Sequence, residues 1–194
     1  MIPINVMPEM PTQAFLDVLQ QQGFAGEIDT SAAQRAVYAT DNSIYERPPQ
    51  AIVCPKHVAD LQVLTRLLAE ERFRGVVLTA RGGGTGTNGQ SLTEGIVVDV
   101  SRHMNHILSI DVAKRQVRVQ AGVVKDQLNR ALKPHGLFFA PELSTSNRAT
   151  IGGMVNTDAS GQGSCTYGKT RDHVLALKTV LWGGEVLQSQ ALSE

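Results

Sequence analysis

Apolar residues repeat at helical spacing in several stretches of the chain. Phe15, Leu16 and their neighbours form one face of a helix predicted over residues 11–22, which Gly23 ends. A short helix is expected over residues 31–38. The strongest pattern predicts a helix over residues 57–72, and its buried stripe consists of Val58, Leu61, Leu64, Leu67 and Leu68.

Runs of β-branched and other apolar residues predict strands at 51–54, 76–80 and 96–100. Because a helix separates the first two, we expect a parallel strand–helix–strand unit. Residues 106–110 and 116–121 alternate between apolar and polar side chains, which predicts a half-buried hairpin.

The second half of the chain combines a helix with a long polar segment. The helix is predicted over residues 123–134, with Lys125-Asp126 on its solvated side. Residues 137–170 are rich in hydroxyl, amide and glycine groups, and a connection of this length is unusual unless it binds a ligand. Within it, residues 150–154 resemble a helix start that offers free N–H groups to an anion or to a polar ring edge.

Two shorter stretches complete the pattern. Residues 40–45 form a polar loop that ends in an aromatic side chain, and this loop either contacts a ligand or makes a capped connection. Residues 1–10 are expected to be an extended arm. A closing hairpin is predicted from strands at 175–182 and 185–188, with Gly183-Gly184 as its turn.

Composition and charge argue against several classes of protein. The 194-residue chain suits one domain or two small subdomains, and its formal net charge of zero, with no basic block, argues against nucleic-acid binding. No apolar run is long enough for a transmembrane segment. Cys54 and Cys165 make neither a disulfide framework nor a metal cluster, and no secretory signal pattern is present, so we expect a cytoplasmic location.

A glycine-rich loop between two β-branched runs carries the main candidate chemistry. Its glycines stand at positions 82, 83, 84, 86 and 89. Glycine allows close backbone approach and positive φ, and successive N–H groups in such a turn form an anion-binding nest. Thr85, Thr87 and Asn88 add side-chain donors, and Arg81 adds a positive charge. The loop therefore suits a phosphate, most economically a pyrophosphate; the alternative is a glycine-rich turn without a ligand.

The type of phosphate loop follows from what comes after it. Gly84-x-Gly86-x-x-Gly89 matches the dinucleotide fingerprint, but that mechanism needs a helix directly after the loop. Gly95 and an apolar run follow instead, which leaves no room for a crossover helix. No Gly-Lys-Ser/Thr sequence follows either. We therefore expect a strand–loop–strand phosphate site, and an NAD-dependent Rossmann enzyme would require a helix after Gly89.

Seven motifs together resemble the FAD-binding domains of PCMH type in the vanillyl-alcohol-oxidase superfamily. They are Arg81-Gly-Gly-Gly-Thr-Gly, Ala121-Gly-Val, Pro141, Ala149-Thr-Ile-Gly-Gly, Asn156-x-x-Ala-Ser-Gly, Tyr167-Gly and Gly183-Gly. The resemblance implies an α+β fold in which a small parallel βαβ subdomain is followed by a mixed or antiparallel sheet with flanking helices. We expect residues 1–47 to form an N-terminal helical arm and residues 48–194 to form the FAD-binding domain, cut short at its C-terminal end.

The resemblance also implies which residues bind FAD. Those that would hold its pyrophosphate are Arg81, Gly82, Gly83, Gly84, Thr85, Gly86, Thr87, Asn88 and Gly89. Those that would line the dinucleotide, the last two by main chain, are Pro141, Ser144, Thr145, Ser146, Gly152 and Gly153. Those near the flavin or ribityl chain would be Asn156, Ala159, Ser160 and Gly161. Tyr167 and Gly168 would help to close the site, and Val174 would contact the adenine side.

Residues 41–45 and 141–148 favour one subgroup, the large bacterial FAD and iron–sulfur D-2-hydroxyacid dehydrogenases. This similarity implies hydride transfer from D-2-hydroxyglutarate to flavin N5, with the electron acceptor left open. Gly84 stands where covalent flavoproteins of the superfamily often have a histidine, so noncovalent FAD is expected. The catalytic base, the substrate-binding residues and a [4Fe–4S] cluster would lie beyond Glu194. We expect no metal site in this chain, and we expect the chain alone to be inactive.

Two other functions remain open from the sequence. One is a noncatalytic module that binds FAD or another nucleotide. The other is a related oxidoreductase that acts on D-lactate or glycolate.

Overall fold

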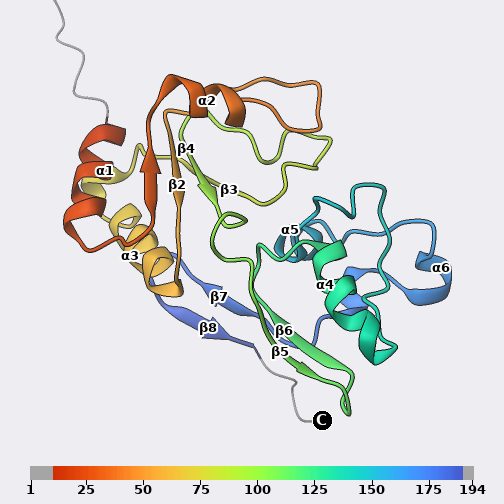
Figure 1. Cartoon of the computed structure of the whole chain (residues 1–194). Coiled ribbons are helices and arrows are strands. Elements are labelled where there is room, and N and C mark those ends of the chain that lie inside the picture. The colour runs from red at the N-terminus through yellow and green to blue at the C-terminus, as the bar shows by residue number, and fades with distance from the viewer. Residues whose placement is uncertain (1–10, 190–194) are drawn as a thin grey trace, which may run out of the picture.

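A four-stranded mixed sheet organises the first half of the chain in the computed structural model, which describes residues 11–189 (Figure 1). The expected extended arm at 1–10 lies outside these described residues. The sheet has the order β1-β2-β4-β3, and β2, β4 and β3 run parallel. The strands are β1 (Glu27–Asp29), β2 (Ala51–Cys54), β3 (Leu78–Arg81) and β4 (Ile96–Asp99).

The connection between β3 and β4 is the glycine loop, residues 82–95. Parallel neighbours usually need a crossover helix because the chain must return to the same end of the sheet. Here the loop itself makes that return, so the expected absence of a helix after Gly89 is confirmed. The expected parallel unit is present, but β2 and β3 are not neighbours, because β4 lies between them.

Helices cover both faces of this sheet. On one face α1 (Pro11–Gln21), α3 (Val58–Leu68) and the 3-10 turn η1 (Glu71–Phe73) pack against alternate strand residues, with Phe15 and Ile96 fully buried. On the other face α2 (Ala32–Tyr38) covers Ile52, Cys54 and Val97. Strands buried on both faces explain the continuous apolar runs in β2 and β4.

The segment that the sequence sets apart as a helical arm contributes to the same sheet. Its two predicted helices are present as α1 and α2, and Ser31 caps α2 by accepting a hydrogen bond from Gln34. In addition, β1 pairs antiparallel with β2. This strand is not predicted from the sequence, because three residues with one apolar side chain have no recognisable period.

The second half of the chain forms two antiparallel hairpins with short helices between them. The first hairpin, β5 (Ile107–Asp111) and β6 (Gln116–Val119), packs against α4 (Lys125–Leu132), which continues into η2 (Lys133–His135). The expectation that Lys125 is solvated is wrong, because this residue is only 7 % exposed.

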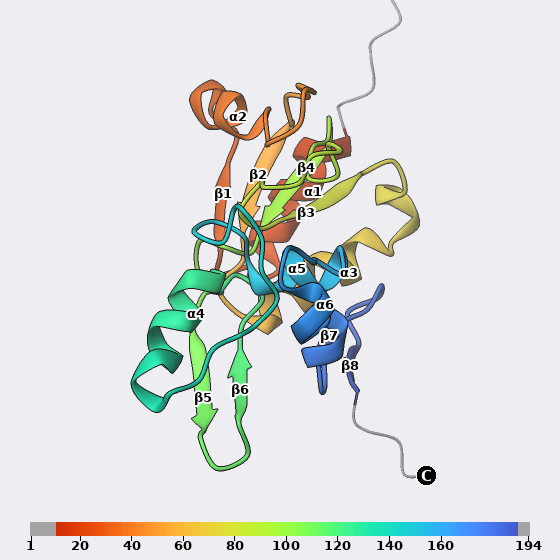
Figure 2. The same ribbon diagram turned by 90° about the vertical axis from the view of Figure 1, so that its right-hand side faces the viewer.

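The long polar segment contains α5 (Ile151–Asn156), α6 (Ser164–Tyr167) and η3 (Thr170–His173). The second hairpin, β7 (Lys178–Val180) and β8 (Val186–Gln188), reaches back to α3, where Gln62 Nε2 donates to the Gly184 carbonyl at 2.9 Å. Figure 2 shows α5 between the first sheet and the two hairpins. No helix within residues 11–189 has the length and apolar character needed to cross a membrane.

Candidate functional site

The glycine loop packs directly against the segment that leads into α5. A Cβ atom on Gly82 would overlap the Thr150 side chain, and one on Gly83 would overlap the Arg148 carbonyl oxygen. Residues with side chains could not approach this closely. Two motifs that lie far apart in the sequence therefore meet at the end of β3.

The main-chain N–H groups of the loop form a run of available donors. Within residues 11–189, no acceptor is found for the N–H groups of residues 82–87. Residues 82–86 are half-buried, and Gly84 and Gly89 have φ values of +60° and +70°. Successive half-buried N–H groups need an acceptor, and a phosphate group supplies several oxygens. The residues present therefore fit the pyrophosphate that the sequence predicts at this loop.

The polar loop after α2 holds the glycine loop in place. Asn42 N donates to the Gly84 carbonyl at 3.0 Å, and Ser91 Oγ donates to Asp41 Oδ2 at 2.9 Å. Burial opposes ionisation of Asp41, but hydrogen bonds from Ser43 and Ser91 and the nearby Arg81 charge outweigh it and lower its pKa. These contacts give residues 41 and 42 a structural role in positioning the glycine loop.

Arg81 also links the start of the glycine loop to the region around the end of α2. Its guanidinium donates to the Thr40 carbonyl at 2.8 Å and to the Tyr38 carbonyl at 3.3 Å, and it lies 5.1 Å from the centre of the Tyr38 ring. The positive charge predicted at the loop entrance thus contacts carbonyl groups at the end of α2 and in the connection that follows it.

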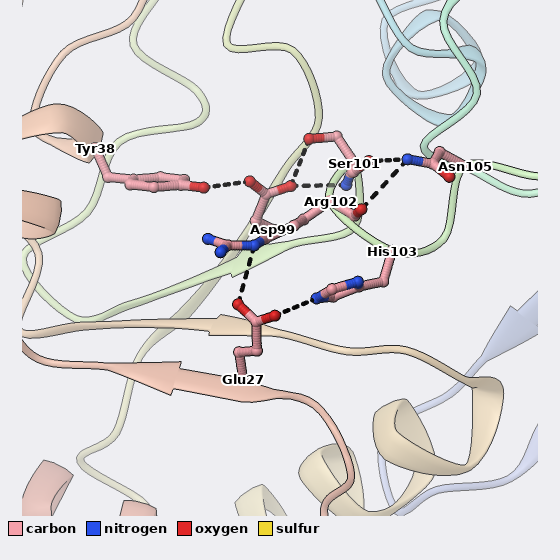
Figure 3. Close-up of polar contacts among 7 residues, drawn as sticks. All are labelled: Glu27, Tyr38, Asp99, Ser101, Arg102, His103 and Asn105. Carbon is pink, nitrogen blue, oxygen red and sulfur yellow. Dashed lines mark hydrogen bonds and ion pairs between the residues drawn. The ribbon is translucent and has the colours of Figure 1, made fainter.

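A polar network supports the end of β4, where Asp99 pairs with Arg81 of β3 (Figure 3). Tyr38 Oη donates to Asp99 Oδ2 at 2.5 Å, and burial, followed by this hydrogen bond, raises the pKa of Tyr38. Asp99 Oδ1 also accepts from the Ser101 N–H at 2.7 Å. The sequence carries no signal for this pairing, because 61 residues separate Tyr38 from Asp99.

The other half of the network ties β1 to the connection after β4. Glu27 accepts from Arg102 Nε and pairs with His103 Nε2, each at 2.9 Å (Figure 3). Cys54 is buried close by, and this burial, together with the Asp99 charge, raises the pKa of its thiol to about 11. Cys54 is therefore a neutral structural thiol at physiological pH.

The start of α5 differs from the sequence expectation. The Ile151 N–H donates to the Val123 carbonyl and the Gly152 N–H donates to the Ala121 carbonyl, each at 2.8 Å. The Gly153 N–H lies 3.4 Å from its acceptor, Thr150 Oγ1. The expectation of free N–H groups here is wrong, because the β6–α4 connection supplies carbonyl partners from outside the helix.

The remaining predicted site residues form a second cluster around residues 141–174. Gly161 packs so closely on Glu142 that a Cβ would overlap the Glu142 carbonyl oxygen. Thr170 Oγ1 donates to the Ala159 carbonyl at 2.7 Å. The other members differ in exposure, from buried Pro141 through half-buried Thr145 and Ser146 to exposed Ser144, Asn156, Ser160 and Tyr167.

Turns complete this second cluster. Gly168 has a φ of +82° and lies against the Asp172 carboxylate, so a side chain there would be strained. The Tyr167 carbonyl accepts from His173 Nε2 at 2.8 Å, and half-buried Val174 follows η3. A surface cavity of about 460 Å³ lies elsewhere, between residues such as Thr12 and Thr79.

Comparison with known proteins identifies the family. The family model described as an FAD binding domain matches residues 49–190. The chain belongs to this family. The resemblance drawn from the seven motifs is therefore confirmed, and the residues that carry it lie within the matched region.

Curated relatives include D-2-hydroxyglutarate dehydrogenases. The protein from Pseudomonas putida is 66% identical over 190 residues, which is 98% of this chain and 19% of that protein. The protein from Escherichia coli K12 is 60% identical over 178 residues, 92% of this chain and 18% of that protein. The glycolate oxidase subunit GlcD of Bacillus subtilis is 34% identical over 182 residues, 93% of this chain and 38% of that protein. The chain spans about a fifth of the length of these two D-2-hydroxyglutarate dehydrogenases.

Solved structures confirm the α+β fold. An alkyldihydroxyacetonephosphate synthase matches with a TM-score of 0.79 at 22% identity, over 98% of this chain and 36% of that one. The 6-hydroxy-D-nicotine oxidase from Arthrobacter nicotinovorans matches with a TM-score of 0.74 at 24% identity, over 86% of this chain and 36% of that one.

Proposed function

We propose that the glycine loop binds the pyrophosphate of noncovalent FAD, and that the whole protein oxidises D-2-hydroxyglutarate to 2-oxoglutarate. The run of N–H groups without an acceptor at residues 82–87 carries the first part. An FAD pyrophosphate offers oxygens to several such donors at once. The second part is supported by four D-2-hydroxyglutarate dehydrogenases that are 58–66% identical to this chain.

In this proposal the chain binds and orients the cofactor. The glycine loop holds the pyrophosphate, residues 141–146 line the dinucleotide, and the α5–α6 region lies near the flavin. Bound FAD would accept the hydride from the α-carbon of the substrate. Residues 48–194 would form the FAD-binding domain, and the described part of residues 1–47 would brace it through β1 and the polar loop after α2. The catalytic base, substrate contacts and a [4Fe–4S] cluster would lie in parts of the whole protein outside this chain.

The test uses the full-length protein after desalting, with its visible absorption spectrum as the readout. We expect a retained flavin band that bleaches under anaerobic conditions when D-2-hydroxyglutarate is added, and L-2-hydroxyglutarate is the matched control. A protein that takes up no FAD would contradict the cofactor assignment. A flavin band that D-2-hydroxyglutarate leaves unchanged would contradict the substrate assignment alone.

The glycolate oxidase subunits, at 32–34% identity, favour a second candidate substrate class. The same assay with glycolate and D-lactate separates the two. Bleaching by either of these, without bleaching by D-2-hydroxyglutarate, would assign the related 2-hydroxyacid activity.

A further inference from the structure

The first residue of α4 is a buried lysine. Lys125 is 7 % exposed, and it is the one buried cation among residues 11–189. Lysine is almost never buried unless its ammonium group is paired, because removing that charge from water is costly. The surroundings of Lys125 therefore either supply an anion or leave room for one.

The described protein supplies no anion to Lys125. Within residues 11–189, no carboxylate forms an ion pair with its ammonium group, and no acceptor forms a hydrogen bond with it. Asp60 shows the contrast. It is also buried, but its carboxylate accepts three main-chain N–H groups at 2.8 Å, those of Ala25, Lys56 and His57.

The Lys125 ammonium group keeps a small opening to the surface. Among residues 11–189, Gln50 Oε1 is the one fully enclosed side-chain polar atom that lacks a partner. Lys125 Nζ, which also lacks a partner, is therefore not fully enclosed. The ammonium group therefore contacts solvent even though the rest of the side chain is covered.

The position of Lys125 connects it to the glycine loop. Its N–H donates to the Ala149 carbonyl at 3.0 Å, and the following N–H, of Asp126, donates to the Ser146 carbonyl at 3.1 Å. Thus α4 begins against residues 146–150. Gly82 and Gly83 of the glycine loop pack against Thr150 and Arg148 of this same segment. The buried lysine and the run of available N–H groups therefore abut one short segment.

Two other cations belong to the glycine loop and to the segment on which it packs. The Arg81 guanidinium is held by the Tyr38 and Thr40 carbonyl groups. Arg148 is exposed to solvent, where its charge is screened. Lys125 is the buried cation beside the segment that packs on the loop, and it would act together with Arg81, whose guanidinium lies against Gly84.

We propose that the Lys125 ammonium group provides the counter-charge for the FAD pyrophosphate at the glycine loop. This inference rests on the proposed function and adds a second, buried charge to the N–H groups and Arg81. Without FAD, Lys125 is a largely buried charge with no partner and adds nothing to the stability of the apoprotein. With FAD, it becomes a charge-assisted contact, which is among the stronger kinds of hydrogen bond.

The test compares Lys125→Met with the wild type in the full-length protein. Methionine keeps most of the apolar stem and removes the charge. We expect the dissociation constant of FAD to rise about tenfold or more, because hydrogen bonds to charged groups are worth that much. The dissociation constant should also depend less on ionic strength, while the melting temperature of the apoprotein should stay the same or rise. Flavin fluorescence quenching and thermal unfolding provide the two readouts.

Two further variants complete the design. Lys133→Met removes an exposed charge from the other end of α4 and should leave FAD affinity unchanged. Lys125→Arg keeps the charge and should retain most of the affinity. Wild-type affinity in Lys125→Met would overturn the inference. So would a lower apoprotein melting temperature with an unchanged salt dependence of FAD binding, because that pattern assigns a structural role. Failure of the wild type itself to bind FAD would instead refute the proposed function.

Discussion

Replacement of Gly83 by alanine tests the contact on which the candidate site is built. Gly83 has no positive φ, so the substitution acts through contact and not through backbone strain. The new Cβ would overlap the Arg148 carbonyl oxygen and would lie 2.8 Å from its carbonyl carbon. Ordinary contact begins at 3.4 Å, and the oxygen is nearer than the carbon, so the two segments must separate by considerably more than about 0.6 Å.

The size of the effect follows from this overlap. Overpacking a tight contact costs about 1–3 kcal/mol, and the atoms that Cβ would meet here are main chain, which cannot rotate out of the way. The displaced loop would also misalign its N–H groups relative to the pyrophosphate. We therefore expect Gly83→Ala to weaken FAD binding about tenfold or more.

The assay is FAD titration of the full-length apoprotein, followed by flavin fluorescence. Gly75→Ala is the matched control, because its Cβ would have no neighbour nearer than 3.8 Å and its φ is not positive. This control should bind FAD as the wild type does. Wild-type FAD affinity in Gly83→Ala would refute the reasoning, since the close approach would then have no bearing on the site.

Four other outcomes are expected. Gly153→Ala should weaken FAD binding by keeping the dinucleotide from the main chain, and unchanged affinity would remove Gly153 from the site. Tyr38→Phe should lower stability by about 1–2 kcal/mol in chemical denaturation, because Asp99 loses a donor, and an unchanged midpoint would contradict this. At pH 8, iodoacetamide should modify exposed Cys165 and spare Cys54, so native labelling of Cys54 would be inconsistent with its burial. Because folding raises the Cys54 pKa from 9.0 to about 11, the stability from its neutral thiol should be lost as pH rises through that window, and Cys54→Ala should show a smaller loss.

Local patterns were sufficient to predict most elements. The strands predicted at 51–54 and 96–100 correspond to β2 and β4, the second with one residue fewer, because strands buried on both faces leave a continuous signal. The order of those strands was not predictable in the same way. The order depends on the path of residues 82–95, which place β4 between β2 and β3.

The glycine spacing located the candidate loop but not its partners. Arg81, at the start of the loop, binds the Thr40 carbonyl, and Gly83 packs on Arg148. Both contacts join residues that lie far apart in the sequence. The burial of Lys125 was missed for the same reason. A Lys-Asp pair at a helix start is normally solvated, but here the helix begins against residues 146–150.

Hydrogen–deuterium exchange at the glycine loop tests the central claim most directly. The full-length protein would be compared with and without saturating FAD, and exchange would be followed in peptides that cover residues 82–87. The N–H groups there have no acceptor within residues 11–189, so we expect them to exchange quickly in the apoprotein and to become protected when FAD binds. Unchanged exchange in this segment, with FAD bound at one per chain, would contradict the claim that the loop holds the pyrophosphate.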